Sequence, residues 1–421
     1  MTQGVRDMTK KSIKTVTVFL LAIIIVVVNI PSISRRIGGE GILIVMAAIF
    51  LLNYRLYLGR LTIKATLLVL LYIAMEVLYE VLGISDSEYI YYYYTISFLL
   101  FALIGPPLVE RLNRKQQNII LFAELGSLLY IMYDNIRLKI QYGNAYVRLG
   151  DVISGSTNVI STPYISAIVL YCGILWTVFL YVKNNRLLPL TMMALMLAFE
   201  IFVGQRMIAI ILLIVMLMLQ LIVSKKMSLT GHIIIFLLIF LAIIIIVDLE
   251  NVLTLLSSMV SNIRIKRRID QLLYAIRSGS IEGAGGSLEV RFKLIMNSFR
   301  TFFASPSNFL FGVGESRINN LIIGHHSQWA DQAAKYGIIG VILLYCALRR
   351  CFKSSMIFMS LNSKLNLKNH YTIFIWYFAI RGMLGMVIYP HFGIALFVII
   401  PIIMIRLNSE GNEYCLIRRC K

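Results

Sequence analysis

The chain is short of charged residues, and this shortage excludes an ordinary soluble domain. Of its 421 residues, 14% are charged and 59% are hydrophobic. Soluble domains carry about a quarter of their residues as charges. Apolar runs of about 18 residues or more recur along the chain, which indicates helices that cross a bilayer. Barrel strands would alternate apolar and polar residues, and these runs do not. We therefore predict an all-α, polytopic membrane protein.

Signatures of several other chemistries are missing as well. Gly312-Val313-Gly314 lacks the Gly-Lys-Ser/Thr continuation of a nucleotide-binding loop, so ATP-driven transport has no support. No internal repeat is evident. No CxxC pair is present, and no cysteine falls in the long polar segment described below; the five are Cys172, Cys346, Cys351, Cys415 and Cys420. We expect no disulfide framework, no metal and no cofactor.

The apolar runs predict about twelve spans. Their approximate limits are 13–31, 40–54, 63–83, 89–108, 117–133, 160–182, 187–204, 206–224, 231–249, 333–349, 371–389 and 391–406. Basic residues precede the first run, but no small-x-small cleavage site follows it, so we interpret it as an uncleaved span. The chain divides into spans 1–9 (1–249), a long loop (250–332), and spans 10–12 with the tail (333–421).

The basic residues that give the formal net charge of +20 are distributed as the expected topology requires. Lys and Arg concentrate in alternate short loops, which places both termini in the cytoplasm and the long loop outside. Arg35 and Arg36 are an exception on the outer side. We attribute the charge to orientation and to attraction for anionic membrane lipids, and we expect no nucleic-acid partner.

The long loop is too extended to be a simple connector, so we look for function there. It carries nine basic residues: Arg264, Lys266, Arg267, Arg268, Arg277, Arg291, Lys293, Arg300 and Arg317. These residues form either a solvated, headgroup-facing surface or a binding site for an anionic substrate. We predict amphipathic helices over about 252–277 and 288–303, with a glycine-rich break between them. Pro306 to Asn308 should end the second helix, and 311–314 should form a turn.

The residues most suited to catalysis are His326, Arg206 and Arg291. A lone loop histidine is usually an ordinary polar residue, but an imidazole can accept a proton near neutral pH. His326 also precedes a span whose glycines, Gly337 and Gly340, favour close helix packing. Arg206, at the start of a span, is either a snorkelling side chain or a phosphate ligand. Arg291 poses a similar choice between a solvated helix face and a phosphate contact.

Other residues could bind substrate. Arg381 lies within a predicted span, where a charge lines a cavity or pairs with an acid, and Glu200 is a candidate partner. The tyrosines at 89–94 favour an interfacial belt over stacking on sugars. His325 and His326 are adjacent, so their side chains diverge and zinc binding is poorly supported. The further candidates for substrate contact are His325, Trp329, Arg300, Arg317, Arg381 and Tyr389.

The second half of the chain combines a long outer loop with several short motifs: Gly204-Gln205-Arg206, the run 291–300, Phe311–Gly314, Gly324-His325-His326-Ser327-Gln328-Trp329 and Tyr336–Gly340. In these features it resembles the O-antigen polymerase and ligase superfamily. The family usually has His-Asn where this chain has His326-Ser327, and often a serine at the position of Gln205. The matching histidine is therefore His326.

The resemblance implies metal-independent glycosyl transfer outside the cytoplasmic membrane. The donor would be an oligosaccharide on undecaprenyl pyrophosphate, and the acceptor a sugar hydroxyl of another lipid-linked repeat unit, for O-antigen, capsule or exopolysaccharide. Arg206 and Arg291 would hold the pyrophosphate and His326 would be the base. A chain-length regulator and a flippase of the same pathway would be partners. A ligase that moves finished glycan to a lipid or wall acceptor is one alternative, and a polysaccharide flippase or transporter is another.

Overall fold

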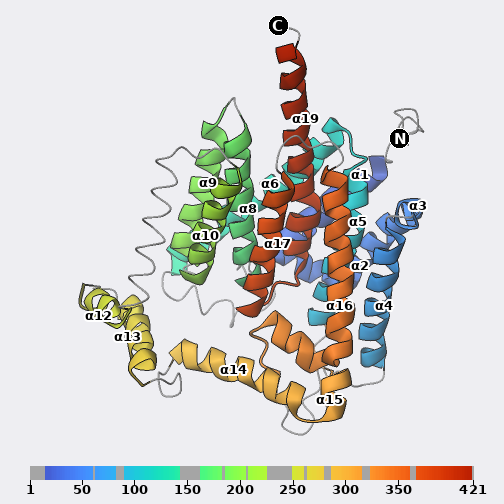
Figure 1. Cartoon of the computed structure of the whole chain (residues 1–421). Coiled ribbons are helices and arrows are strands. Elements are labelled where there is room, and N and C mark those ends of the chain that lie inside the picture. Colours follow the sequence, from blue (N-terminus) through green and yellow to red (C-terminus); the bar gives the residue numbers. More distant parts are fainter. Residues whose placement is uncertain are drawn as a thin grey trace.

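The computed structural model describes residues 15–59, 62–81, 90–142, 162–182, 185–204, 207–224, 249–259, 263–278, 286–314, 323–360 and 367–419. Within these ranges the regular structure is helical and no strand is present, as the all-α prediction requires (Figure 1). The helices are α1 (Thr15–Asn29), α2 (Pro31–Leu52), α3 (Tyr54–Tyr57), α4 (Ile63–Val81), α5 (Ile90–Val109), α6 (Arg114–Tyr142), α8 (Thr162–Tyr181), α9 (Leu187–Phe199), α10 (Met207–Val223), α12 (Leu249–Met259), α13 (Ile263–Ser278), α14 (Gly286–Phe303), α15 (Pro306–Phe311), α16 (Gln328–Ser360), α17 (Leu367–Met383), α18 (Pro390–Ile394) and α19 (Ile400–Arg419), with π-helical turns η3 (Glu200–Gly204) and η5 (Ala395–Ile399).

Two of the described helices are long and apolar enough to cross a membrane. They are α6 and the continuous helix Pro390–Ser409; a third candidate is the pair α1–α2, bent by 119°. The surface of the bundle is apolar too: Leu67, Leu71 and Leu78 form a stripe along α4, each more than half exposed. Soluble proteins rarely expose such patches, whereas a bilayer covers them. A count of twelve spans stays a prediction, and the span expected at 231–249 lies outside the described residues.

Several predicted boundaries were wrong. Helix α6 has 29 residues and continues past the expected end at 133, so the loop predicted from 134 starts no earlier than 143. Helix α2 begins at Pro31, where a loop with Arg35 and Arg36 was expected, because proline suits the first turn of a helix. Helix α17 ends at Met383, six residues before the predicted end of that span. Hydrophobicity marks the apolar run, whereas hydrogen bonding decides where the helix ends.

The centre of the bundle is the continuous helical segment α18–η5–α19. Helices α5, α8 and α16 pack against it, and α17 contacts it through Tyr371 and Phe378. Gly105 of α5 lies against the backbone of Phe397, since a Cβ there would be 2.4 Å from the Phe397 carbonyl oxygen. A glycine lets the two backbones approach this closely. Phe378 stacks on Phe98 with ring centroids 5.4 Å apart, and Phe352 stacks on Phe397 at 4.9 Å. These aromatic contacts fix α17 and α16 around the central segment.

Helix α16 is bent at Gly337, whose φ of 62° breaks the helical hydrogen-bond ladder. The carbonyls freed by this break accept hydrogen bonds from the turn after α15: Val313 N–H bonds to Ala334 at 3.0 Å and Gly314 N–H to Lys335 at 2.8 Å. The predicted turn at 311–314 is present. Pro306, however, begins the short helix α15 instead of only ending α14, because Ser305 caps it through Asn308 N–H at 3.1 Å.

Buried polar contacts join α4 to the first part of α16. Glu76 and Lys335 are 3% and 4% exposed and attract each other electrostatically. The Tyr72 hydroxyl donates to Gln332 Oε1 at 2.7 Å. Removing one partner of a buried charge pair leaves the other charge without compensation, which is costly in a low-dielectric interior. The Tyr72–Gln332 hydrogen bond therefore joins the start of α16 to α4, and Glu76 and Lys335 lie buried within electrostatic range of each other beside it.

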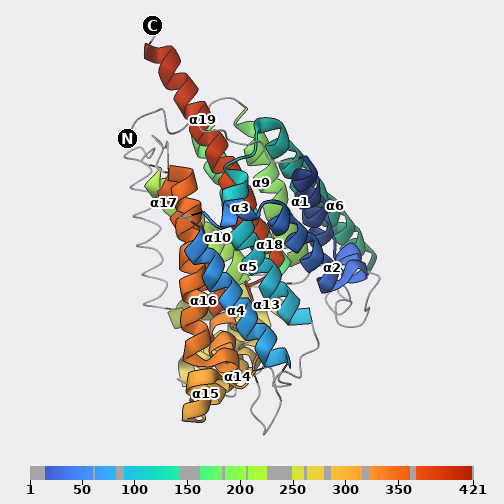
Figure 2. The same cartoon turned by 90° about the vertical axis from the view of Figure 1, so that its right-hand side faces the viewer.

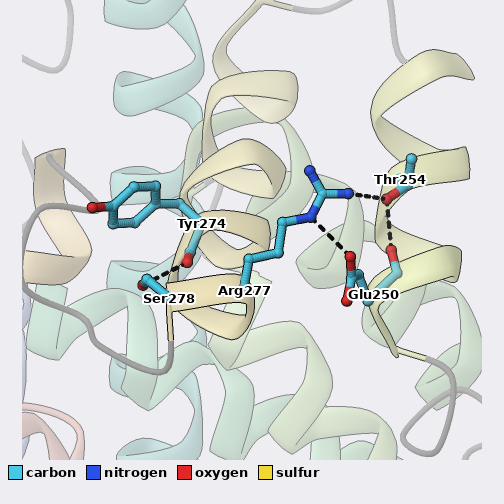
Figure 3. Close-up of polar contacts among 5 residues, drawn as sticks. All are labelled: Glu250, Thr254, Tyr274, Arg277 and Ser278. Atoms are coloured by element: carbon cyan, nitrogen blue, oxygen red, sulfur yellow. Dashed lines mark hydrogen bonds and ion pairs between the residues drawn. The ribbon is translucent and has the colours of Figure 1, made fainter.

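The predicted helix 252–277 is two helices, α12 and α13, which pack against each other as a hairpin. Arg277 Nε donates to Glu250 at 2.8 Å, and its second nitrogen reaches the Thr254 hydroxyl at 3.4 Å (Figure 3). The Ser257 hydroxyl donates to Asp270 at 2.6 Å. These bonds connect the polar sides of the two helices, and Leu255 and Met259 remain exposed.

The two ends of the bundle differ in character. Helices α14 and α15 lie at one end, and the C-terminal part of α19 projects from the other, in both Figure 1 and Figure 2. At the α19 end, Arg406 donates to Gln117 at 2.9 Å and to Asn118 at 2.6 Å on α6. The segment that carries His326 packs on α14, so it lies at the end of the bundle opposite the C-terminal helix. The sides of the membrane on which these ends lie stay a prediction.

We predict that Gly337→Ala destabilises the protein. Its φ is left-handed, and a Cβ would lie 2.4 Å from the carbonyl of Leu310. The expected loss is about 2 kcal/mol or more, measured as a lower melting temperature of the detergent-solubilised protein. Gly126→Ala is the matched control, because nothing lies within 4 Å of a Cβ at that position in α6. Equal melting temperatures for the two variants would contradict the bend at Gly337.

Candidate functional site

The segment before α16 is held at the helix start by a capping arrangement. Ser327 precedes the helix, and its hydroxyl accepts the Ala330 N–H at 3.4 Å. In return the Ser327 N–H donates to Asp331 Oδ2 at 3.1 Å. These two bonds satisfy amides at the helix N-terminus and fix the direction in which the preceding residues leave it.

Asp331 also joins this segment to α14. The carboxylate is 1% exposed and accepts the Ser298 hydroxyl at 2.5 Å. Ser298 Oγ in turn accepts the Gly324 N–H at 2.9 Å. The approach is close, since a Cβ on Gly324 would lie 1.9 Å from the carbonyl oxygen of Leu294. Only glycine fits here, so the sequence around His325 and His326 lies directly on α14.

The backbone of His325 is left-handed, with φ of 53°. Histidine tolerates this conformation better than most residues, yet it costs about 1–2 kcal/mol for an L-residue. The His325 N–H donates to the Asp331 carboxylate, which compensates. The His326 imidazole is partly exposed, and its Nδ1 lies 3.0 Å from the carbonyl oxygen of His325. Asp331 lies within electrostatic range of the same imidazole.

Arg291 lies on the same face of α14 as the residues that contact this segment. Leu294 and Ser298 follow it by three and seven residues, and such residues share one face of a helix. All three are buried or partly buried, whereas Lys293 is exposed. The predicted amphipathic helix is therefore correct, and its inner face carries Arg291 toward the site.

Helix α17 approaches the segment from the other side. The Trp329 indole N–H donates to the Ala379 carbonyl at 2.7 Å, and its ring covers Gly382, where a Cβ would be 2.5 Å away. Gln328 Oε1 accepts the N–H groups of Val387 and Ile388 at 3.2 and 3.1 Å. The segment from Gly324 to Trp329 is thus fixed between α14 and the end of α17.

The guanidinium groups of Arg291 and Arg381 lie within electrostatic range of each other. Arg381 Nε donates to Ser166 Oγ at 2.9 Å, which directs the group from α17 toward α8. Glu200 of η3 lies within electrostatic range of Arg381, as the sequence led us to expect. Two arginines from separate helices therefore lie within electrostatic range of each other, and Arg381 is also within range of the Glu200 carboxylate.

The remaining predicted residues are placed as follows. Arg206 and Arg317 lie outside the described residues. Arg300 is exposed and lies nine residues after Arg291, on the opposite side of α14, so it does not join the site. Tyr389 is partly buried beside Tyr94, with ring centroids 4.8 Å apart, directly after the backbone that Gln328 holds.

Sequence reasoning missed Asp331 and Ser298. Asp331 lies four residues after Ser327 at a helix start, and this spacing could have identified a capping partner. The contact between Asp331 and Ser298 spans 33 residues, and no local pattern predicts it.

No family model matches the chain, and no curated protein or solved structure matches it either.

The ionisation of Asp331 predicts a pH dependence of stability. Burial raises the pKa of Asp331 from 3.8 to about 6, although its hydrogen bonds and the nearby His326 oppose the rise. The folded state then binds more protons than the unfolded state between these values. The contribution of this group to the free energy of unfolding is fully present below about pH 4. It is lost as the pH rises through 6, and the loss is about 3 kcal/mol at most.

Asp331→Asn keeps the shape but does not ionise. We expect its melting temperature, relative to the parent protein, to increase between pH 4 and pH 7. Thermal unfolding in detergent at a series of pH values measures this difference. A relative melting temperature that stays constant or falls over that range would show that Asp331 is not a buried, reluctantly ionised carboxyl.

Proposed function

We propose that the protein is a membrane glycosyltransferase that polymerises undecaprenyl-pyrophosphate-linked oligosaccharide repeat units at the outer face of the cytoplasmic membrane. One observation carries the proposal. Arg291 of α14 and Arg381 of α17 lie within electrostatic range of each other, and the segment that bears His326 is fixed between the same two helices. A pair of cations beside a potential base suits a substrate that is both a diphosphate and an electrophile.

The arginine pair supports an anionic ligand. Like charges held close together raise the free energy of the protein, and an anion between them removes this cost. Guanidinium groups bind phosphate oxygens through paired hydrogen bonds and keep their charge at all physiological pH values. Arg206 would add a third cation near the start of α10. In a site with little water, these groups stabilise the charge that develops on a leaving diphosphate.

The proposed reaction is one displacement at the anomeric carbon of the donor. His326 takes the proton of the acceptor hydroxyl, and the acceptor oxygen forms a bond to the anomeric carbon. The bond between that carbon and the phosphate oxygen breaks, and the electron pair leaves with undecaprenyl pyrophosphate. Attack from the opposite face inverts the configuration. The two arginines neutralise the leaving group, and the imidazole supplies the base.

Two other functions make different predictions. A ligase would use the same donor chemistry but transfer finished glycan to a lipid or wall acceptor. A flippase would need alternating access, which usually rests on internal repeats. Lipid-linked intermediates of a deletion strain distinguish the three. Single repeats on the outer leaflet indicate a polymerase, long lipid-linked chains indicate a ligase, and repeats retained on the inner leaflet indicate a flippase.

The central prediction concerns His326→Ala and Arg291→Ala. Each variant should abolish long chains and leave lipid-linked single repeats, because one lacks the base and the other lacks a diphosphate contact. Arg291→Lys should recover little activity, since an ammonium cannot form the paired hydrogen bonds. We expect losses of about a hundredfold or more in the rate of elongation by purified protein.

Lys293→Ala is the matched control for this experiment. Lys293 is on α14 beside Arg291, but it points away and pairs with Glu289 at 2.5 Å. It should elongate chains like the parent protein. Long chains made by His326→Ala at the parental rate would exclude His326 as the base.

A further inference from the structure

The α12–α13 hairpin has apolar side chains that its own packing leaves uncovered. Ile269, Leu272 and Ile276 recur every three or four residues, which places them in one row along α13, the apolar row. Leu272 and Ile276 are exposed, and Ile269 is partly exposed. On α12, Leu255 and Met259 are one turn apart and are 61% and 72% exposed. Both helices of the hairpin therefore present apolar surface outward.

Positive charge is concentrated at the start of α13. Four of the first six residues of this helix form a basic cluster: Arg264, Lys266, Arg267 and Arg268. The first turn contains no acidic residue. Cations at the N-terminus of a helix oppose its macrodipole, so this arrangement is unfavourable for an isolated hairpin. An anionic surface beside the helix start removes that cost.

The hairpin itself supplies few acids to balance the cluster. Helices α12 and α13 contain five basic and two acidic residues, which is an excess of three positive charges. Each acid has a hydrogen-bond partner across the hairpin. Glu250 accepts Arg277 Nε at 2.8 Å, near the C-terminal end of α13, and Asp270 accepts the Ser257 hydroxyl at 2.6 Å (Figure 3). The excess charge thus calls for an anion from outside these two helices.

The hairpin also lies close to the expected membrane surface. Helix α12 begins at Leu249, the last residue of the apolar run 231–249 that is predicted to cross the bilayer. No linker separates the run from α12, so the hairpin stays near the surface at which the run ends. In Figure 1, α12 and α13 lie to one side of the bundle, beyond the start of α14. A bilayer surrounds the sides of such a bundle, so its headgroups are the surface within reach.

We infer that the α12–α13 hairpin lies on the bilayer surface, with the basic cluster against the phosphates of anionic phospholipids and the apolar row at the boundary with the acyl chains. A helix with many basic residues and one apolar face is typical of an interfacial helix. Anionic headgroups attract each cation near the surface, and burial of the apolar row adds to the binding. This contact is independent of the proposed reaction, because none of these residues belongs to the candidate site.

Probes on two sides of α13 test the contact in the full-length protein. A fluorophore is attached to Ile276→Cys, in the apolar row, or to Tyr274→Cys. Tyr274 is the matched control, because it is also exposed, is about 160° away around the helix and points away from α12 in Figure 3. The parent for both variants carries Cys346→Ser, Cys415→Ser and Cys420→Ser, whereas Cys172 and Cys351 are buried and are kept.

The labelled proteins are placed in nanodiscs whose lipids have brominated acyl chains, which quench a probe inside the bilayer. In phosphatidylglycerol, the probe at 276 should be quenched about threefold more strongly than the probe at 274, or more. Equal quenching at the two positions would overturn the inference.

Salt and charge removal test the requirement for an anionic surface. Quenching at 276 should fall by about half or more at about 1 M salt, where the screening length is about 3 Å. A similar fall is expected in phosphatidylcholine, and in the variant Lys266→Gln, Arg267→Gln, Arg268→Gln. Lys293→Gln on α14 is the control and should leave the quenching unchanged. Quenching at 276 that is the same in both lipids and at both salt concentrations would show an apolar contact alone and would overturn the inference.

A protein surface on the apolar row would give a different result. If a second copy of this chain or another of its segments covers the row, the probe at 276 is shielded both from brominated lipids and from iodide in the water. That outcome would overturn the contact with the bilayer. On a bilayer surface, the probe at 276 should be quenched by the lipids and the probe at 274 mainly by iodide.

Discussion

The geometry of the candidate site depends on the hydrogen bonds that the Asp331 carboxylate accepts. It is buried, yet it accepts the Ser298 hydroxyl from α14 and two backbone amides from the segment before α16. A buried acceptor with several donors defines one geometry, because each lost bond would leave a polar group unsatisfied. The carboxylate thus joins the face of α14 that carries Arg291 to the segment that carries His326, and the Ser298–Gly324 hydrogen bond adds a second link.

The rest of the bundle supplies a rigid frame around this junction. Gly337 bends α16 and frees carbonyls that hold the turn after α15, so the elements on either side of the site are fixed to each other. Trp329 and Gln328 attach the segment to α17 and to the backbone before Tyr389. This packing also sets the position of Arg381, because Arg381 lies at the end of α17 that Trp329 covers. Arg291 and Arg381 lie within electrostatic range of each other, and in the proposed function an anionic ligand would relieve their repulsion.

Periodicity and composition predicted the helical class and the amphipathic helix that carries Arg291. The expected range of 288–303 agrees with α14 at 286–303, because apolar side chains recur on one face. The roles of glycine and proline at helix ends and bends were predicted less accurately. Pro306 both follows one helix and begins the next, and Gly337 bends α16 where close packing alone was expected.

The long-range parts of the site could not be read from the sequence. Ser298 and Asp331 are separated by 33 residues, and histidine does not by itself require the left-handed φ found at His325. Arg381 was recognised from the energetic cost of a charge in an apolar run, but its proximity to Arg291 is a tertiary fact. Candidate site residues could thus be named from the sequence. Their proximity in the folded protein depends on buried contacts that the sequence pattern does not reveal.

The most direct test is an electron cryomicroscopy structure of the full chain in a lipid nanodisc with an unreactive lipid-linked diphosphate sugar. The account predicts diphosphate density between the guanidinium groups of Arg291 and Arg381, with the His326 imidazole on the side of the anomeric carbon opposite the diphosphate. Diphosphate density away from both arginines, or on the side of the membrane opposite His326, would contradict it.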